Sequence, residues 1–310
     1  MNRDLKFLVT LWPRLKFFPR FAVDHRLTGG IRLNSAMMNQ TDLEAELAAL
    51  KAMSVDVPLY FDVKGRQLRV EEVFDGPTHM ELRLNHAISV PTPQVVLFKA
   101  EKDSAKLIHL EEGGRRLIFE GGPANYVHEG ESIHIRDNRL SVSGPTFTDK
   151  EKAKIELVRQ FGFTRYFLSY VESQAVVDEF LELVGRDSEV RLKIENQAGL
   201  DFVATEFQKK DNLCLVAARG DLYIEVPRPY QILKAMRLIV DKDPEAIAAS
   251  RLLLSIMQSP VPSCADFSEL AWLYDIGYRS WMLCDEICLR EDWLGAAINV
   301  LEGFRSHYHQ

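Results

Sequence analysis

The chain has no long hydrophobic run, few cysteines and no excess of positive charge. Its 310 residues include four cysteines, too few for a disulfide framework in a chain of this length. No apolar run approaches the roughly 18 residues needed to cross a bilayer, and the N-terminus lacks the apolar core and cleavage site of a secretory signal. A formal net charge of −7, with no basic cluster, argues against a nucleic-acid partner. We therefore expect a cytoplasmic protein that binds neither membrane nor nucleic acid.

Several familiar catalytic motifs are also missing. The sequence contains no G-x-G-x-x-G, no Walker loop, no H-E-x-x-H and no G-x-S-x-G. Cys284 and Cys288 have the i, i+4 spacing of a helix face, but no histidine or further cysteine nearby completes a zinc set. Mechanisms that depend on these motifs lack support. The apolar fraction of 46% is nevertheless enough for a full buried core.

Eight apolar runs of strand length recur along the chain, and segments with helical periodicity separate most of them. Thr41–Glu44 and Thr148–Glu151 resemble capping boxes, which predict helix starts. Short buried strands that alternate with helices predict a (β/α)8 TIM barrel, an α/β fold. The expected strands are Phe7–Leu11, Gly30–Leu33, Leu59–Val63, Tyr166–Val171, Val190–Ile194, Leu213–Ala217, Leu252–Ile256 and Ser280–Leu283. The expected helices are Thr41–Met53, Glu151–Phe161, Ser173–Val184, Tyr230–Val240, Ser268–Tyr274 and Trp293–Phe304.

The connection after the third expected strand breaks this alternation. Residues 70–144 show no convincing helix, but several alternating segments separated by turn signals. They predict a small β domain inserted after the third strand, at the mouth of the barrel, where the active sites of such folds lie. We therefore expect barrel parts at residues 1–69 and 146–310 and a β-rich lid domain at 70–145. Its expected strands are Val95–Lys99, Lys106–Leu110, Arg116–Phe119, Ser132–Arg136 and Arg139–Val142.

Charged residues stand at the carboxyl ends of two neighbouring expected strands. Lys193 and Glu195 point to the same side because side chains alternate along a strand. Asp221 follows the next strand, beside Gly220. A structural ion pair would account for a single Lys-x-Glu, but charged ends on two parallel strands favour a functional site. Two carboxylates and a lysine suit a hard divalent cation bridged to an anionic substrate.

The same residues carry a resemblance to a known family. Lys193–Asn196 and Ala218–Pro227 look like the barrel of the pyruvate kinases, and further segments match in the same order over about 300 residues. The inserted domain is shorter than is usual in that family, and we expect the family's C-terminal regulatory domain to be absent. The other matching segments are Thr10–Pro13, Ile31–Asn34, Asp62–Gly65 with Arg69, Gly130–Val142, Ser255–Met257, Pro262–Ser263 and Met282–Glu286.

The resemblance implies a role for each matching residue. Glu195 and Asp221 would hold Mg²⁺ or Mn²⁺, and Lys193 would stabilise charge on a transferring phosphoryl group or on an enolate oxygen. These parts fit a mechanism of positioning and charge neutralisation. The implied catalytic residues are Lys193, Arg32 and Ser255; the substrate-binding residues are Arg32, Arg69, Gly220, Asp221, Asn34 and Asp62; the metal ligands are Glu195 and Asp221.

The sequence also departs from the family pattern. Asn34 and Asp62 remain from the family's monovalent-cation site, but Ala36 and Val63 replace its two hydroxyl ligands, so we do not expect K⁺ to bind. Met37 replaces a histidine that helps to place the nucleotide. The resemblance therefore leaves open whether ADP or ATP binds.

Three functions remain in contention. The first is a phosphotransferase that moves the phosphoryl group of phosphoenolpyruvate to a nucleotide or another acceptor. The second is a metal-dependent lyase, a decarboxylase or aldolase that works through a pyruvate enolate. The third is a non-catalytic protein that binds phosphoenolpyruvate or a partner. Because the positions for metal, phosphate and enolate are kept, we favour the first, with a small phosphorylated or 2-oxo acid substrate. The sequence leaves homo-oligomer formation open.

Overall fold

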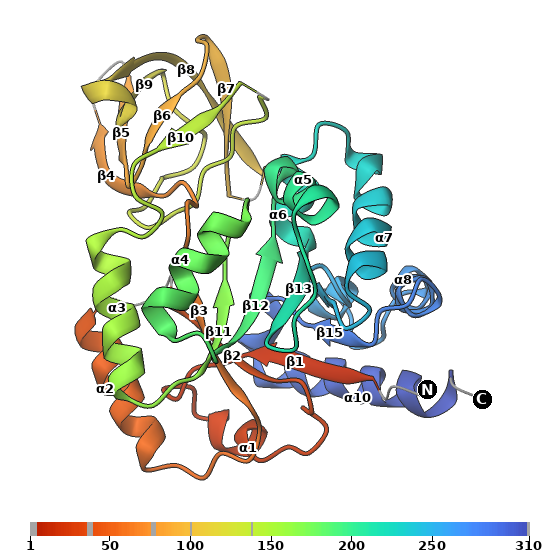
Figure 1. The fold of residues 1–310 in the computed structure, drawn as a ribbon. Helices are drawn as coiled ribbons and strands as arrows, with labels where there is room; N and C mark the ends of the chain where they lie inside the picture. Colours follow the sequence, from red (N-terminus) through yellow and green to blue (C-terminus); the bar gives the residue numbers. More distant parts are fainter. Residues whose placement is uncertain (1–4, 36–39, 76–78, 100, 138, 309–310) are drawn as a thin grey trace.

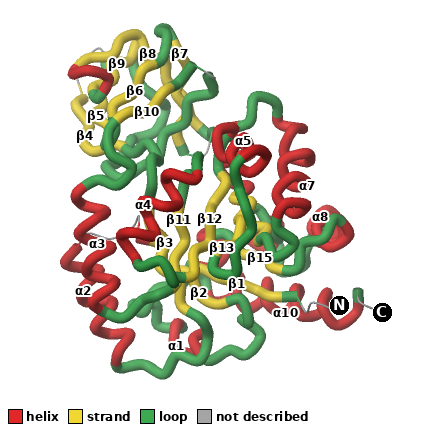
Figure 2. The backbone as a smooth tube through the Cα atoms, viewed as in Figure 1, coloured by secondary structure: helices red, strands yellow, loops and turns green. Residues whose placement is uncertain are grey.

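Eight parallel strands form a closed barrel at the centre of the molecule (Figures 1 and 2). The computed structural model describes residues 5–35, 40–75, 79–99, 101–137 and 139–308. Each barrel strand pairs with its neighbours in chain order, and the last pairs with the first. The strands are β1 (Lys6–Thr10), β2 (Gly30–Asn34), β3 (Leu59–Val63), β11 (Arg165–Leu168), β12 (Glu189–Ile194), β13 (Leu213–Ala218), β14 (Ile247–Ala249) and β15 (Ser280–Met282). The predicted TIM barrel is confirmed.

Helices surround the barrel (Figure 2) and complete the α/β alternation. Within the described residues, no helix is both long and apolar enough to cross a membrane. The helices are α1 (Phe18–Ala22), α2 (Gln40–Lys51), α3 (Asp149–Gln160), α4 (Gln174–Val184), α5 (Gln197–Thr205), α6 (Arg219–Glu225), α7 (Ile232–Lys242), α8 (Cys264–Asp275), α9 (Asp285–Cys288) and α10 (Glu291–His307). Short 3₁₀ segments are η2 (Glu112–Gly114), η3 (Pro229–Gln231) and η4 (Leu254–Met257).

Polar caps and alternating apolar residues explain why these elements form where they do. The Thr148 hydroxyl accepts a hydrogen bond from the Glu151 amide and so begins α3, as the sequence predicts. Thr41, in contrast, does not cap α2, because that helix already begins at Gln40. Inside the barrel, inward-facing side chains such as Leu8 and Phe167 form a separate small core. The interior of the barrel is therefore packed, as barrels of eight strands require.

The seventh strand was predicted at the wrong place. It is Ile247–Ala249, whereas Leu252–Ile256 lies beyond it, where the 3₁₀ segment η4 forms. Ala248 pairs in register with β13 and β15, which fixes the strand despite its small side chains. Ser250 and Arg251 then take left-handed φ angles of 67° and 60°, and these end the strand.

A small β domain is inserted after β3, as expected, and lies above the carboxyl ends of the barrel strands (Figure 1). It has its own core, which includes Leu82, Phe98 and Phe119. The predicted strand Ser132–Arg136 instead makes two isolated bridges, through Ser132 and His134. A five-stranded antiparallel sheet has the order β4 (Val70–Asp75), β5 (Met80–Leu84), β9 (Arg116–Glu120), β8 (Asp103–Glu111) and β7 (Gln94–Phe98), and β6 (Ala87–Ser89) pairs with β10 (Ser141–Ser143).

The separate core predicts that the inserted domain can lose stability without the barrel. Leu82→Ala should destabilise residues 70–145 by about 2–5 kcal/mol, because Leu82 is fully buried there. Hydrogen exchange should accelerate in that segment alone. All four tryptophans lie in the barrel parts, so the midpoint of denaturant unfolding measured by tryptophan fluorescence should stay unchanged.

Leu192→Ala, in the core around the barrel, is the matched control and should lower that midpoint. If Leu82→Ala lowers it as much as Leu192→Ala does, the two parts unfold as one unit. The predicted division at residues 70 and 145 would then be wrong.

Candidate active site at the barrel mouth

Lys193, Glu195 and Asp221 lie together at the carboxyl end of the barrel. Lys193 is on β12, Glu195 directly follows that strand, and Asp221 is in the first turn of α6, which follows β13. Lys193 Nζ lies 2.8 Å from Glu195 Oε1, and the carboxyl groups of Glu195 and Asp221 are within hydrogen-bonding reach of each other. Glu195 is fully buried, whereas the side chain of Asp221 keeps 28% exposure. A ligand can therefore approach the pair from the side of Asp221.

The buried Glu195 carboxylate lacks part of the compensation that its charge requires. Its Oε2 accepts a 2.7 Å hydrogen bond from the Tyr170 amide, which a left-handed φ of 52° turns toward the site. Its Oε1 forms an ion pair with Lys193 Nζ but has no hydrogen-bond partner assigned in the described part of the chain. Burial and the Asp221 charge raise the pKa of Glu195, and Lys193 opposes them. A cation between the two carboxylates would supply the missing compensation.

This donor set fits a magnesium or manganese ion held by two carboxylates. Mg²⁺ commonly uses one or two protein carboxylates and completes its shell with waters and substrate oxygens. Among the described residues, no three His, Cys, Asp or Glu side chains are grouped so that they could hold a metal ion by themselves. Glu195 and Asp221 would therefore hold the ion together with substrate and water.

Asp62, on β3, is the centre of an adjoining cluster of cations. Its Oδ2 lies 2.8 Å from Arg32 Nε, 2.9 Å from Lys64 Nζ and 3.8 Å from Lys193 Nζ. Ser169 Oγ bridges to Lys193, with 3.0 Å to its Nζ and 3.2 Å to Asp62 Oδ1. Burial alone would raise the pKa of Asp62, but these cations outweigh it and hold the pKa far below its ordinary value. Asp62 therefore keeps its charge and anchors the cations.

Lys64 and Ser169 were not predicted as site residues. A signal for Lys64 was available, because Asp62-Val63-Lys64 has the same alternation as Lys193 and its partner two residues later. Gly65 then lets β3 and β11 approach each other: a Cβ at this position would lie 2.5 Å from the Ser169 carbonyl oxygen. The close approach brings both Lys64 and Ser169 to the Asp62 carboxylate.

Arg32 and Asn34, on β2, both bind an acidic residue that the sequence did not single out for the site. Asp285, the first residue of α9, lies 2.9 Å from Arg32 Nη1 through Oδ1 and 2.7 Å from Asn34 Nδ2 through Oδ2. Arg32 Nη1 also donates to Thr10 Oγ1 at 3.1 Å. The guanidinium is thus held by Asp62 on one edge and by Asp285 and Thr10 on the other.

Two further predicted substrate-binding residues lie at the same mouth. Arg69 donates through Nε and Nη2 to Gln67 Oε1, at 3.1 and 2.6 Å, and through Nη1 to the Gly130 carbonyl of the inserted domain. It is close enough to Lys64 to be among the cations that lower the pKa of that residue, after the larger effect of burial. Gly220 is in the first turn of α6, where N–H groups have no intrahelical acceptor.

The predicted catalytic residue Ser255 contacts residues other than those of this cluster. It lies in η4, and its hydroxyl hydrogen-bonds to Asp266 and to the Ser263 amide at the start of α8. Ser250 instead follows β14 directly, and a Cβ on Gly220 would lie 3.6 Å from the Ser250 hydroxyl oxygen. This placement follows from the position of the seventh strand, which ends before residue 250. Ser250 is the better candidate for a hydroxyl at the mouth.

The inserted domain contributes a histidine that sequence reasoning did not identify. His134 Nδ1 lies 2.6 Å from Glu225 Oε1 and its Nε2 lies 3.6 Å from Asp221 Oδ1, so the ring contacts both carboxylates of α6. Burial lowers the pKa of His134, but Glu225 and Asp221 reverse the effect and raise it. Arg136 adds a hydrogen bond to the Ile224 carbonyl. No spacing in the sequence connects residues 134 and 221, because the contact joins two domains.

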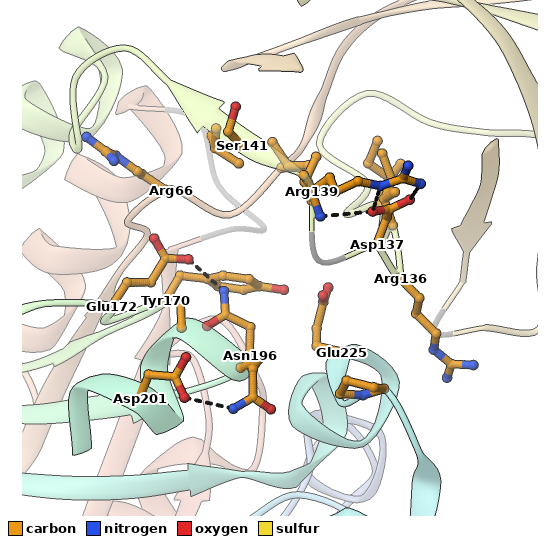
Figure 3. Close-up of a pocket in the computed structure, with 18 residues that line it drawn as sticks. Arg66, Arg136, Asp137, Arg139, Ser141, Tyr170, Glu172, Asn196, Asp201 and Glu225 are labelled. Carbon is orange, nitrogen blue, oxygen red and sulfur yellow. Dashed lines mark hydrogen bonds and ion pairs between the residues drawn. The ribbon is translucent and has the colours of Figure 1, made fainter. Parts of the chain in front are cut away.

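A cleft of about 800 Å³ separates the inserted domain from the barrel beside these contacts. Tyr170 and Glu225 lie on its barrel side, and Arg139, paired with Asp137, lies on its inserted side (Figure 3). Asn196 donates to Glu172, also on the barrel side. The cleft is large enough for a small polar ligand, but Lys193, Glu195 and Asp221 are not among the residues that line it.

The expected loss of a potassium site rests partly on residues outside the described ranges. Ala36 and Met37 lie among residues 36–39, which the structure does not describe. Val63 is described and fully buried at the end of β3, where it offers no oxygen ligand from its side chain.

Comparisons with known proteins identify relatives of this chain. A family model described as the barrel domain of pyruvate kinase matches residues 127–287, a range that includes Lys193, Glu195 and Asp221. Proteins named pyruvate kinase are similar over much of the chain. The one from Methanocaldococcus jannaschii is 26% identical, and the match covers 92% of this chain and 65% of the relative. The one from Thermoplasma acidophilum is 25% identical over 77% of this chain and 46% of the relative, and the one from Mycobacterium intracellulare is 28% identical over 68% of this chain and 49% of the relative.

The chain thus spans between about half and two thirds of the length of these relatives. The family match nevertheless extends over more than half of the 310 residues and covers barrel strands β11 to β15 with Lys193, Glu195 and Asp221. The chain therefore belongs to the pyruvate kinase family.

Proposed function

We propose that this chain is a metal-dependent phosphotransferase that acts on phosphoenolpyruvate and the pyruvate enolate. The observation that carries the proposal is the convergence of Lys193 with the Glu195–Asp221 pair at the barrel mouth. Glu195 and Asp221 would hold Mg²⁺ or Mn²⁺, which when bound would offset negative charge on the oxygens of the ligand. The family relationship supports the reaction class, and the acceptor is left open.

The protein groups act by position and charge. In the forward reaction, the bond between phosphorus and the enolate oxygen breaks, a bond forms between phosphorus and an acceptor oxygen, and the enolate carbon takes up a proton to give pyruvate. Burial would lower the pKa of Lys193, but Asp62 and Glu195 raise it overall, so Lys193 remains a cation. It can therefore stabilise the charge that develops on the departing oxygen throughout the neutral pH range.

One observation favours a second function. Arg32, expected to hold phosphate, is already bound by Asp62 and Asp285. A site with limited room for phosphate would suit a lyase that forms the enolate from a 2-oxo acid by breaking a carbon–carbon bond. The carboxylate pair would serve that chemistry equally well.

Phosphorus NMR of phosphoenolpyruvate with Mg²⁺ and candidate acceptors tests the proposal. We expect the phosphoenolpyruvate signal to disappear only when an acceptor is present. Glu195→Gln should slow this reaction by about a hundredfold or more, because one carboxylate of the metal pair is lost. Circular dichroism should show an unchanged fold.

Glu189→Gln is the matched control, because Glu189 lies on the same strand but pairs with Arg165 and Arg191. It should leave the rate unchanged. Turnover of oxaloacetate without phosphate, unaffected by Arg69→Ala, would support the lyase instead. Full activity of Glu195→Gln would reject the assignment of the site.

The cations around Asp62 predict that activity does not depend on potassium. Asp62 already binds Lys64 and Arg32, so a monovalent ion would have to compete with two side chains for it. Replacing K⁺ by Na⁺ or tetramethylammonium at constant ionic strength should change the initial rate by no more than about twofold. Strong activation by K⁺ alone would show that such an ion does bind.

His134 predicts a coupling between the two domains. Loss of its bond to the Glu225 carboxylate should weaken docking of the inserted domain by about 2 kcal/mol, roughly thirtyfold in the opening equilibrium. His134→Leu should therefore accelerate hydrogen exchange in residues 131–137 and 219–225. His109→Leu, exposed on β8, is the control and should not. If both variants show the same hydrogen-exchange rates in these two segments, His134 does not hold the inserted domain on the barrel.

A further inference from the structure

Asp285 binds Arg32 and Asn34, the two residues of β2 that were expected to bind a ligand anion. It stands at the carboxyl end of the eighth strand, and β1 lies between that strand and β2. Its carboxylate spans this distance and uses both oxygens, one on Arg32 and one on Asn34. Arg32 and Asn34 are each only 7% exposed, so few other groups can reach them. The Asp285 carboxylate, an anion of the chain itself, thus occupies the position on Arg32 where a ligand anion would bind.

The two edges of the Arg32 guanidinium are not equivalent. The edge formed by Nε and Nη2 faces Asp62, which is fully buried and has no access for a ligand. The other edge, Nη1, faces Asp285, whose side chain keeps 32% exposure. A ligand oxygen can therefore reach Arg32 only from the side where Asp285 now lies.

A ligand phosphate and the Asp285 carboxylate would compete for the same nitrogen, Nη1 of Arg32. A guanidinium Nη has two N–H groups, and those of Nη1 point to Thr10 and Asp285. A phosphoryl oxygen that binds there must replace the Asp285 oxygen, or it must share the edge with a second negative charge. The pKa of Asp285 is lowered, because Arg32 and Asn34 outweigh the opposing effect of burial, and its carboxylate is charged near neutral pH.

We propose that Asp285 is a specificity-determining residue, an internal anion that a phosphorylated ligand must displace from Arg32 and Asn34. The inference rests on the proposed function in taking Arg32 as the residue that faces the phosphoryl group. Asp285 weakens binding of ligands that carry a phosphate and leaves binding of the same acids without phosphate unaffected. Such a residue would favour release of the phosphorylated acceptor after transfer, or preference for an unphosphorylated 2-oxo acid.

The test compares the affinity of two ligands by isothermal titration calorimetry in the presence of Mg²⁺. Phosphoenolpyruvate carries the phosphate, and oxalate resembles the enolate without it. Asp285→Asn should tighten binding of phosphoenolpyruvate by about tenfold or more, because it removes the competing charge and keeps the size of the side chain. Binding of oxalate should change by less than about twofold, since it does not require Arg32.

Glu286→Gln is the matched control. Glu286 is the next residue of α9, is exposed, and loses the same charge on substitution. It should leave both affinities unchanged. An equal gain in Glu286→Gln would assign the effect to general electrostatics and overturn the proposal, as would Asp285→Asn with no gain for phosphoenolpyruvate or with equal gains for both ligands.

A structural measurement gives a second test that does not depend on a variant. In crystals of the unsubstituted protein with phosphoenolpyruvate and Mg²⁺, the Asp285 side chain should have left Arg32 and a phosphoryl oxygen should bind Nη1. Phosphoenolpyruvate bound while Asp285 stays on Arg32 would overturn the proposal. Neither measurement requires turnover, so a protein without transferase activity would reject the proposed function and still test Asp285.

Discussion

The buried charge of Asp62 is the constraint on which the rest of the mouth depends. A carboxylate without solvent must be paired, and Asp62 is paired with Arg32, Lys64 and, through Ser169, with Lys193. Removal of any one of these cations would leave the buried charge of Asp62 less well compensated. The cluster therefore fixes the positions of the very cations that an anionic substrate would meet.

The compensation of buried charge at the mouth is uneven. Asp62 and Asp285 each pair with the guanidinium of Arg32, and Asp62 also pairs with Lys64, whereas Lys193 approaches both Asp62 and Glu195. Compensation is weakest at Glu195 and Asp221, whose negative charges repel each other, and one Glu195 oxygen has no hydrogen-bond partner in the part of the chain that the structure describes. This is where a divalent cation would restore the balance. The anionic substrate would then follow the cation.

Much of this arrangement could be predicted from the sequence, because it depends on strand alternation. Lys193 and Glu195 share a face, and parallel strands bring Asp221 to the same end, so the sequence predicts their neighbourhood correctly. The seventh strand could not be placed, because Ile247–Ala249 has weak strand propensity and the apolar Leu252–Ile256 is more conspicuous. The contacts of Asp285 and His134 depend on strand closure and on the docking of two domains. No local pattern encodes either.

The central claim is that Glu195 and Asp221 together bind a divalent cation beside Lys193. A crystal grown with Mn²⁺ and oxalate, measured near the manganese absorption edge, tests it most directly. The account predicts an anomalous peak about 2.1–2.2 Å from an oxygen of each carboxylate, with oxalate completing the coordination. A peak elsewhere, or an ordered oxalate with no manganese between the two carboxylates, would contradict it.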